Sequence, residues 1–403
     1  MPRKSAERWL SGLSKWFRGR HGSGRRRIRD TACEELLGRA AVTLEESRIR
    51  SRLRGRVVLV TGAGGSIGSE LCRQIVRFRP AALIGFDQAE TPLYQVEQEL
   101  GETFPDVEFH AALGSIQSER CLEEVFREHQ PASVYHAAAY KHVPMMEAHV
   151  CQAVENNVFG THQVAAAAAR HGVEDFVLIS SDKAVRPVSV LGATKRLAEL
   201  VCLGAAPDTR AGRKPDTKFM AVRFGNVLGS NGSVVRVFER QIAAGGPVTV
   251  THPEMQRFFM TVTEAAQLVL QAAAIGAGGE IFGLDMGDPI RILDLARAMI
   301  RSRGLDPDDI PIRFCGIRPG ERMFEELCSG DEITLATRHA HVRMFRGEAV
   351  AREALERALG ALRRSVEARD AAGVVLAMRE IIPNYTPSAF AASAGRRARS
   401  VVA

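Results

Sequence analysis

A serine, a carboxylate and an amine stand together at Ser181, Asp182 and Lys183, in the segment ISSDKAV. These are side-chain types that move protons: a lysine acts as a base once it has lost its proton, and a protonated carboxyl acts as an acid. A lysine that is partly withdrawn from water has a lowered pKa, which favours the free amine. We therefore take these three as candidate catalytic residues. The alternative is an ordinary salt-bridged turn.

A glycine-rich turn offers a site for phosphate groups. Residues 57–68 read VVLVTGAGGSIG, in which a buried strand leads into a G-x-x-G-x-x-G turn and a helix follows. Glycines permit the tight turn, and the helix N-terminus presents free N–H groups and a positive dipole end to a pyrophosphate. The pattern predicts a dinucleotide site, with an empty doubly wound fold as the alternative. The predicted contacts are Gly62, Gly65, Ser66, Ile67 and Gly68.

The ends of the following strands complete this predicted site. Asp87 closes the second strand, and a carboxylate there binds a ribose diol and repels a 2′-phosphate, so NAD is favoured over NADP. Ser115 and Ile116 follow the third strand, where an adenine ring would lie, although a plain turn explains them equally well. Ala137 and Ala138 follow the fourth strand and let the backbone pass close to a cofactor.

A second lysine, Lys195, lies on a predicted helix over 190–204. Many short-chain dehydrogenases carry Tyr-x-x-x-Lys, in which the tyrosine is the base and the lysine holds the nicotinamide ribose. We therefore place Lys195 among both the catalytic and the cofactor-binding residues. The tyrosine position is Leu191, which cannot transfer a proton. Either the protein is not a catalyst, or other groups perform the acid–base chemistry.

Polar residues also follow the fourth strand. Lys141 and His142 are predicted to line the substrate site, although each is equally suited to capping a helix. Asn157, in ENNVFGT, is suited to bracing the site through water or a backbone carbonyl.

The frame that must position these residues is an alternation of short apolar runs and helical stretches from Arg56 onward. This alternation predicts an α/β fold, with a Rossmann-like doubly wound parallel sheet. The expected strands are 57–61, 81–87, 107–113, 133–139, 175–181 and 219–227. The expected helices of this part are 66–78, 118–129, 145–171 and 190–204.

After residue 227 the pattern is less regular and predicts a smaller C-terminal α/β lobe for the substrate, with helices at 232–244, 263–275 and 291–303. The expected divisions are a basic amphipathic leader (1–27), a linker segment (28–55), an NAD-binding Rossmann domain (56–227), a substrate lobe that shares elements with it (228–347), an amphipathic helical segment (348–386) and a disordered basic tail (387–403).

Charge and cysteine usage limit the classes of partner. The 403 residues carry a formal net charge of +7, but residues 1–27 alone hold nine Lys/Arg against one acid, so the folded body gives no reason to expect nucleic acid. Seven widely spaced cysteines without C-x-x-C indicate reduced thiols in a cytoplasmic protein and no metal site.

No apolar run is long enough to cross a membrane. Trp9 and Trp16 share one helical face of the leader, which predicts peripheral contact with the inner face of an anionic membrane; a disordered basic leader is the alternative.

Nine ordered segments together resemble the polysaccharide-biosynthesis branch of the extended short-chain dehydrogenases. The characterised members of that branch are nucleotide-sugar 4,6-dehydratases acting on UDP-N-acetylglucosamine. The resembling segments are 36–39, 57–75, 137–149, 155–161, 175–196, 222–235, 245–261, 278–296 and 317–327.

The resemblance implies a mechanism. NAD takes a hydride from sugar C4, and the resulting ketone acidifies the C5–H bond. Lys183 removes the C5 proton, Asp182 protonates the departing C6 hydroxyl, and the hydride returns to C6. The product is a UDP-2-acetamido-2,6-dideoxy-4-keto-hexose for surface polysaccharide. Soluble members have tyrosine at the position of Leu191, so we assign the C4 hydroxyl proton to Ser181, directly or through water.

The substrate lobe then fits a UDP-sugar. Asn226 ends a strand beside the site, and the extended run around Val248 is of the kind that pairs with uracil. Arg257 and Arg318 are candidates for the diphosphate, which favours bidentate guanidinium groups, although a lone arginine more often forms a surface salt bridge. Glu321 would hold Arg318 or the uridine ribose.

Two other functions remain open from the sequence. One is a UDP-sugar 4-epimerase or a C5-inverting dehydratase on the same fold, and the other is a non-catalytic NAD-binding module associated with the membrane. Extended members usually pair through two long helices, here 145–171 and 190–204, so we expect a homo-oligomer, dimeric or larger.

Overall fold

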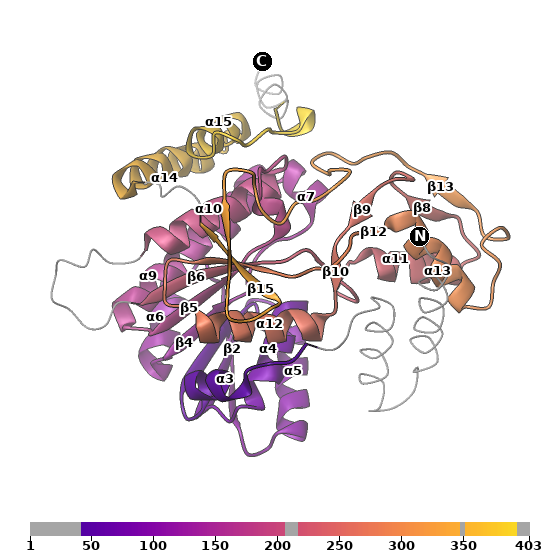
Figure 1. The fold of residues 1–403 in the computed structure, drawn as a ribbon. Coiled ribbons are helices and arrows are strands. Elements are labelled where there is room, and N and C mark those ends of the chain that lie inside the picture. The colour runs from indigo at the N-terminus through magenta and orange to yellow at the C-terminus, as the bar shows by residue number, and fades with distance from the viewer. Residues whose placement is uncertain (1–41, 206–216, 347–350, 393–403) are drawn as a thin grey trace.

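The computed structural model describes residues 42–205, 217–346 and 351–392, and its largest feature is a sheet of nine strands. The strand order is β14-β15-β11-β6-β5-β4-β1-β2-β3 (Figure 1). All neighbours from β11 to β3 run parallel, and β15 and β14 join antiparallel. This confirms the predicted Rossmann-like doubly wound sheet. The strands are β1 (Val57–Thr61), β2 (Ala82–Asp87), β3 (Glu108–Leu113), β4 (Ser133–His136), β5 (Asp175–Ile179), β6 (Lys218–Arg223), β11 (Ile281–Leu284), β14 (Ile333–Ala336) and β15 (Val342–Arg346).

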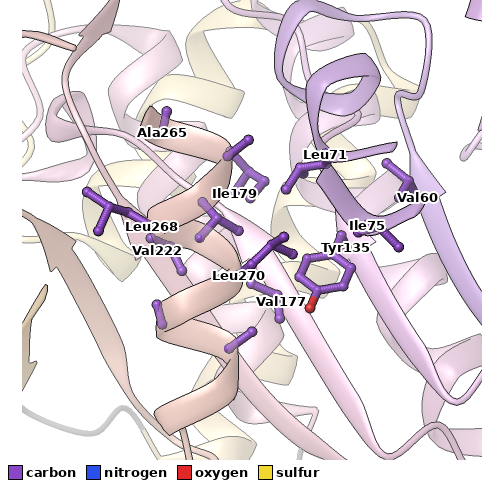
Figure 2. Packing of buried hydrophobic residues seen from close by; sticks show 14 of the residues in the cluster. Val60, Leu71, Ile75, Tyr135, Val177, Ile179, Val222, Ala265, Leu268 and Leu270 are labelled. Carbon is purple, nitrogen blue, oxygen red and sulfur yellow. The ribbon is translucent and has the colours of Figure 1, made fainter. Parts of the chain in front are cut away.

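Helices cover both faces of this sheet. Leu71 and Ile75 of one helix and Leu268 and Leu270 of another meet Val177 and its neighbours on the strands (Figure 2). Burial of each such side chain contributes about 1.5–3 kcal/mol. The helices on this face are α3 (Glu46–Leu53), α4 (Ser66–Val76), α5 (Glu90–Thr103) and α12 (Val262–Ile275). Those on the opposite face are α6 (Glu119–His129), α9 (Thr161–His171) and α10 (Val190–Gly204).

Three expected elements take a different place in the fold. The strand expected over 219–227 ends with β6, and β7 (Asn226–Val227) instead pairs with β10 (Phe259–Met260). The helix expected in the smaller lobe at 263–275 is α12, whose apolar residues complete the core of the large sheet. Part of the expected linker forms α3, because Ile49 and Leu53 are buried against the same core.

The helix expected over 145–171 is broken. It consists of α7 (Val143–Ala148), α8 (Val150–Val154), a π-helical turn (Glu155–Gly160) and α9. Within the π-helical turn, the Asn157 carboxamide accepts a bond from the Tyr140 N–H (2.8 Å) and donates to the Tyr140 carbonyl (3.1 Å) and the Thr194 hydroxyl (3.1 Å). The irregular turn thus ties the segment after β4 to α10, in keeping with the bracing role considered for Asn157.

A smaller lobe packs beside the sheet around its own apolar core. Its strands pair as β8 (Val248–Val250) with β13 (Ile312–Phe314) and as β9 (Gln256–Arg257) with β12 (Ile290–Arg291). Its helices are α11 (Val234–Ala243) and α13 (Ile292–Ser302), on the right of Figure 1.

A helical hairpin, α14 (Arg352–Glu367) and α15 (Ala371–Ile381), packs over α8 and α10. Arg363 lies over the Phe159 ring at 4.5 Å. The hairpin therefore covers part of α10, one of the two helices through which we expected subunits to pair.

The described residues continue beyond the hairpin to residue 392, into the segment 387–403 that we expected to be a disordered tail. Ser388 donates a hydrogen bond to Glu147, whose other carboxylate oxygen accepts from the Val190 N–H at 2.7 Å. Across the described ranges, no helix has the length and hydrophobicity needed to cross a membrane. The predicted leader, 1–27, lies outside those ranges.

Candidate active site

The glycine turn between β1 and α4 is shaped by close backbone contacts. Gly62 has φ +70°, and a Cβ atom there would lie 2.6 Å from the Ala138 main-chain nitrogen. A Cβ atom at Gly68 would lie 2.0 Å from the Gly62 carbonyl oxygen. Only glycine fits either position. Gly65 precedes α4 and no side chain caps this helix, so the N–H groups of its first turn are available to an anion such as a pyrophosphate.

Asp87 at the end of β2 closes this turn. Its two carboxylate oxygens accept hydrogen bonds from the N–H groups of Gly64 and Ala89, both at 2.9 Å. The carboxylate therefore holds the turn itself, and it stands at the strand end where a ribose diol was predicted to bind.

A cavity of about 670 Å³ is lined by the glycine turn, the carboxyl ends of β4 and β5, and the smaller lobe. Its size falls in the range of small-molecule sites, roughly 300–1,000 Å³. The predicted site residues that line it are Gly65, Ser66, Ile67, Gly68, Ala137, Lys141, His142, Ser181, Lys183, Lys195, Asn226, Arg257, Arg318 and Glu321. The predicted residues that do not line it are Gly62, Asp87, Ser115, Ile116, Ala138, Asp182 and Val248.

Lys183 follows β5 in a short 3₁₀ turn. Its Nζ donates to Asp182 Oδ1 (2.9 Å) and to Asn226 Oδ1 (3.2 Å). Ser181 Oγ also donates to Asp182 Oδ1, at 2.8 Å. The Asp182 side chain is 0% exposed, and its Oδ2 finds no hydrogen-bond partner among the described residues. Ser181 and Lys183 therefore face the cavity, with the Asp182 carboxylate behind them.

The charges around Lys183 favour its protonated form. Burial lowers the pKa of Lys183, but the carboxylates of Asp182 and Glu325 raise it more, so the pKa lies above its ordinary value. The lowered pKa expected from loss of solvation alone is not found, because the neighbouring negative charge outweighs that loss. Lys183 can act as a base only if its proton moves to another group.

Lys195 and Leu191 lie one helical turn apart on α10, and both line the cavity. Lys195 Nζ donates to the Ile179 carbonyl at 2.6 Å. Burial lowers the pKa of Lys195 to about 8, although the charge of Glu199 opposes this. Leu191 presents an apolar wall, so acid–base chemistry in this cavity falls to hydroxyl, amine and carboxyl groups elsewhere in its lining.

A group of basic side chains lines the cavity near the smaller lobe. Burial lowers the pKa of Lys141, and burial together with the charges of Lys141 and Arg318 lowers that of His142. The His142 ring faces Gly232, where a Cβ atom would lie 2.6 Å from it. Arg318 is 58% exposed and forms a 2.6 Å ion pair with Glu321. This cluster suits a diphosphate.

Arg257 is directed elsewhere. Its guanidinium donates to the carbonyls of Gln256 (2.7 Å), Met323 (3.2 Å) and Arg322 (2.8 Å). It therefore fastens the segment after Arg318 to β9, which leaves it fewer donors for the diphosphate contact expected from the sequence.

Val248 points away from the cavity, because its side chain is buried in the lobe core and its N–H donates to the Pro311 carbonyl at 2.8 Å. Thr249 and Thr251 line the cavity instead. Successive side chains of a strand point to opposite faces, so period-two alternation in PVTVT was the signal that would have identified them.

Sequence reasoning missed Glu325. Its side chain is only 5% exposed, yet it lines the cavity. Glu325 Oε1 lies 3.8 Å from Lys183 Nζ and 3.9 Å from Arg257 Nε. Its only signal in the sequence was its place shortly after Arg318 and Glu321, in a segment that returns to the end of β5.

Comparisons with known proteins agree with this architecture. A family model described as polysaccharide biosynthesis protein matches residues 58–346. The chain is 50% identical over 307 residues to the probable polysaccharide biosynthesis protein EpsC of Bacillus subtilis (76% of the chain, 50% of EpsC). It is 48% identical over 322 residues to the capsular polysaccharide biosynthesis protein CapD of Staphylococcus aureus (80% and 53%). The UDP-glucose 4-epimerase of Rickettsia rickettsii is 31% identical over 287 residues (70% and 80%). The chain thus spans about half the length of EpsC and CapD.

Solved structures give the same result. Pen from Bacillus thuringiensis superimposes with a TM-score of 0.67 at 30% identity, covering 76% of this chain and 99% of Pen. DesIV from Streptomyces venezuelae, a dTDP-glucose 4,6-dehydratase solved with NAD, has a TM-score of 0.59 at 22% identity, covering 68% and 88%, and shows the shared fold. The resemblance stated from the sequence is confirmed: the chain belongs to the polysaccharide biosynthesis protein family, on the extended short-chain dehydrogenase fold.

Proposed function

We propose that the protein is an NAD-dependent nucleotide-sugar 4,6-dehydratase that converts UDP-N-acetylglucosamine to UDP-2-acetamido-2,6-dideoxy-4-keto-hexose for polysaccharide biosynthesis. The proposal rests chiefly on Lys183, an amine held by Asp182 and Asn226 in the wall of the same cavity that the glycine turn lines. The names of EpsC and CapD support the polysaccharide context.

The residues present fit NAD. Its pyrophosphate would fit the turn at Gly62 and Gly68, where only glycine is sterically allowed, and the uncapped start of α4. Asp87, at the end of β2, suits the adenosine ribose. Lys195 is placed to hold the nicotinamide ribose. NAD, when bound, would accept a hydride from sugar C4 and return it to C6.

The side chains of the cavity would then handle the protons. Ser181 would take the C4 hydroxyl proton and pass it to Asp182, to which it already donates a hydrogen bond. Lys183 would take the C5 proton. The resemblance gives the acid at C6 to Asp182. Lys141, His142 and Arg318 would bind the diphosphate.

The test is to incubate purified protein with UDP-N-acetylglucosamine, without added cofactor, and to measure the product by mass spectrometry. Loss of one water would support a dehydratase that recycles a tightly held cofactor, and proton NMR would then give the configuration at C5 and identify a C5-inverting enzyme. No change in mass or configuration, with NAD still bound, would favour the non-catalytic module.

A UDP-sugar 4-epimerase is the second candidate, favoured by the likeness to the Rickettsia enzyme. An epimerase works at C4 alone and needs no base at C5, so the amine and carboxyls around Lys183 favour the dehydratase. A product of unchanged mass and galacto configuration would establish the epimerase instead.

A further inference from the structure

Elimination of water between C5 and C6 needs an acid as well as a base, and two carboxyls lie beside Lys183. Asp182 Oδ1 is 2.9 Å from Lys183 Nζ, and Glu325 Oε1 is 3.8 Å from it. The structure distinguishes these carboxyls by their access to the cavity.

Asp182 is poorly placed to reach a sugar. Its side chain is fully buried, it does not line the cavity, and Oδ1 already accepts hydrogen bonds from Ser181 and Lys183. Its other oxygen, Oδ2, is also buried. The backbone of Gly225 lies close to this oxygen, since a Cβ atom added at Gly225 would be 3.2 Å from it.

Glu325 has the opposite properties. It lines the cavity, and both of its ion-pair distances exceed hydrogen-bond length, so its carboxyl is available to a ligand. Burial and the charge of Asp182 raise the pKa of Glu325, while Lys183, Arg257 and Arg322 lower it, and the net pKa lies above the ordinary value. A raised pKa favours the protonated form that a catalytic acid must have.

We propose that Glu325 is the catalytic acid that protonates the departing C6 hydroxyl, an inference that rests on the proposed function. Its proton comes from Lys183, which becomes the free amine that the base role requires. Lys183 then takes the C5 proton, the C5–H electron pair forms the C5–C6 double bond, and the C6–O bond breaks. The hydroxyl leaves with the Glu325 proton as water.

The proton balance closes within the same cluster. The C5 proton returns from Lys183 to C5 when C6 is reduced. The proton lost from the C4 hydroxyl passes through Ser181 to Asp182, and Lys183, which lies between the two carboxyls, carries it on to Glu325. Asp182 therefore serves the oxidation at C4 and Glu325 the elimination at C6.

The test compares Glu325→Gln and Asp182→Asn with the wild-type protein, each incubated with UDP-N-acetylglucosamine in deuterium oxide. Glu326→Gln is the matched control, since Glu326 lies outside the cavity and pairs with Arg186. Mass spectrometry measures loss of water, and proton NMR of recovered substrate measures deuterium at C5, which enters only if the C4 ketone forms and Lys183 exchanges the proton.

We expect Glu325→Gln to slow loss of water about 100-fold or more, the effect of losing a positioned acid. Recovered substrate should still gain deuterium at C5, because Lys183, whose side chain is 18% exposed, can lose its proton to water instead. We expect Asp182→Asn to reduce both signals, and Glu326→Gln to match wild type. The inference is overturned if Glu325→Gln loses water at the wild-type rate, or if Asp182→Asn is the variant that exchanges without eliminating.

Two further comparisons distinguish failure of the inference from a structural effect of the substitution and from failure of the proposed function. If Glu325→Gln loses exchange as well, Glu325→Asp decides: recovery of elimination by the shorter carboxyl supports the acid role, and no recovery refutes it. If the wild-type protein itself does not release water, the proposed function fails and the inference falls with it. If the wild type and Glu325→Gln release water at the same rate, only the inference fails.

Discussion

At the scale of single residues, the environment of Lys183 separates two roles that a lysine can play. Asp182 and Asn226 fix its amine, and the nearby carboxylates favour its charge. A lysine held only as a cation would be replaceable by arginine, whereas a base must lose its proton, which arginine does not do in proteins.

We therefore predict that Lys183→Ala and Lys183→Arg both lower turnover by about 100-fold or more. Both should retain NAD through gel filtration, because Lys183 is not among the predicted cofactor contacts. Product formation and bound nucleotide are measured on the same preparations. Full activity in Lys183→Ala would show that the base has been assigned to the wrong residue, and full activity in Lys183→Arg that only charge matters.

At the scale of elements, the sequence was most informative where one regular element carries the residues. The strand at 57–61 and the helix at 190–204 match β1 and α10 to the residue, because a continuous apolar strand and an apolar helix that begins after a capping serine are local patterns. The glycine turn between a strand and a helix could be placed for the same reason.

Sequence patterns could not predict features that depend on distant contacts. The helix at 145–171 is broken where Asn157 binds the backbone of Tyr140, and hydrophobic periodicity does not register such a bond. The orientation of Val248 depends on β13, which lies about sixty residues further along the chain. Glu325 is a site residue through distant contacts such as those of Arg257, which holds the preceding residues by their main-chain carbonyls.

The glycine turn yields a prediction with an internal control. Gly68→Ala would place a methyl group 2.0 Å from the Gly62 carbonyl and so deform the turn, whereas a Cβ atom added at Gly101 of α5 would meet nothing within 4 Å. We expect Gly68→Ala to lose bound NAD and to unfold at a lower urea concentration. Gly101→Ala should keep NAD and gain up to about 1 kcal/mol, the helix preference of alanine over glycine. Equal nucleotide retention in the two variants would contradict the importance of the turn.

At the scale of the whole molecule, a buried charge network joins the sheet to the helix that borders the active site. Arg223 of β6 forms a two-pronged ion pair with Glu199 of α10, at 2.7 and 2.8 Å. Glu199 also accepts a hydrogen bond from Ser180 at 2.6 Å, and Arg223 pairs with Glu332 at 2.8 Å. The strand end that precedes Ser181 is thereby fixed to α10.

This network predicts a specific dependence of stability on pH. Burial would raise the pKa of Glu199, but the charge and hydrogen bonds of Arg223 lower it to about 2. Because the folded-state pKa is depressed, Glu199 stabilises the fold above its unfolded-state pKa of about 4.3, and this contribution disappears as the pH falls toward 2. We expect Glu199→Gln to lower the free energy of unfolding by about 3 kcal/mol at pH 7, since it removes the two-pronged carboxylate partner of the buried Arg223 and leaves it paired with Glu332.

Urea unfolding at neutral and acidic pH measures the free energy of unfolding of the wild type and of Glu199→Gln. The difference between the two free energies should become smaller below about pH 4. Glu356→Gln is a suitable control, because Glu356 forms an exposed pair with Arg352 on the outer side of α14. A difference that stays constant with pH would show that the Glu199 charge does not contribute.

The bond between Ser388 and Glu147 has a consequence for how the protein is made. Glu147 also binds the N–H of Val190, at the start of the helix that carries Leu191 and Lys195. During translation, the parallel sheet and the glycine turn leave the ribosome well before residue 388. A nascent chain can therefore form its parallel sheet and glycine turn while the start of α10 still lacks this bond, which forms only after the hairpin and Ser388 have emerged.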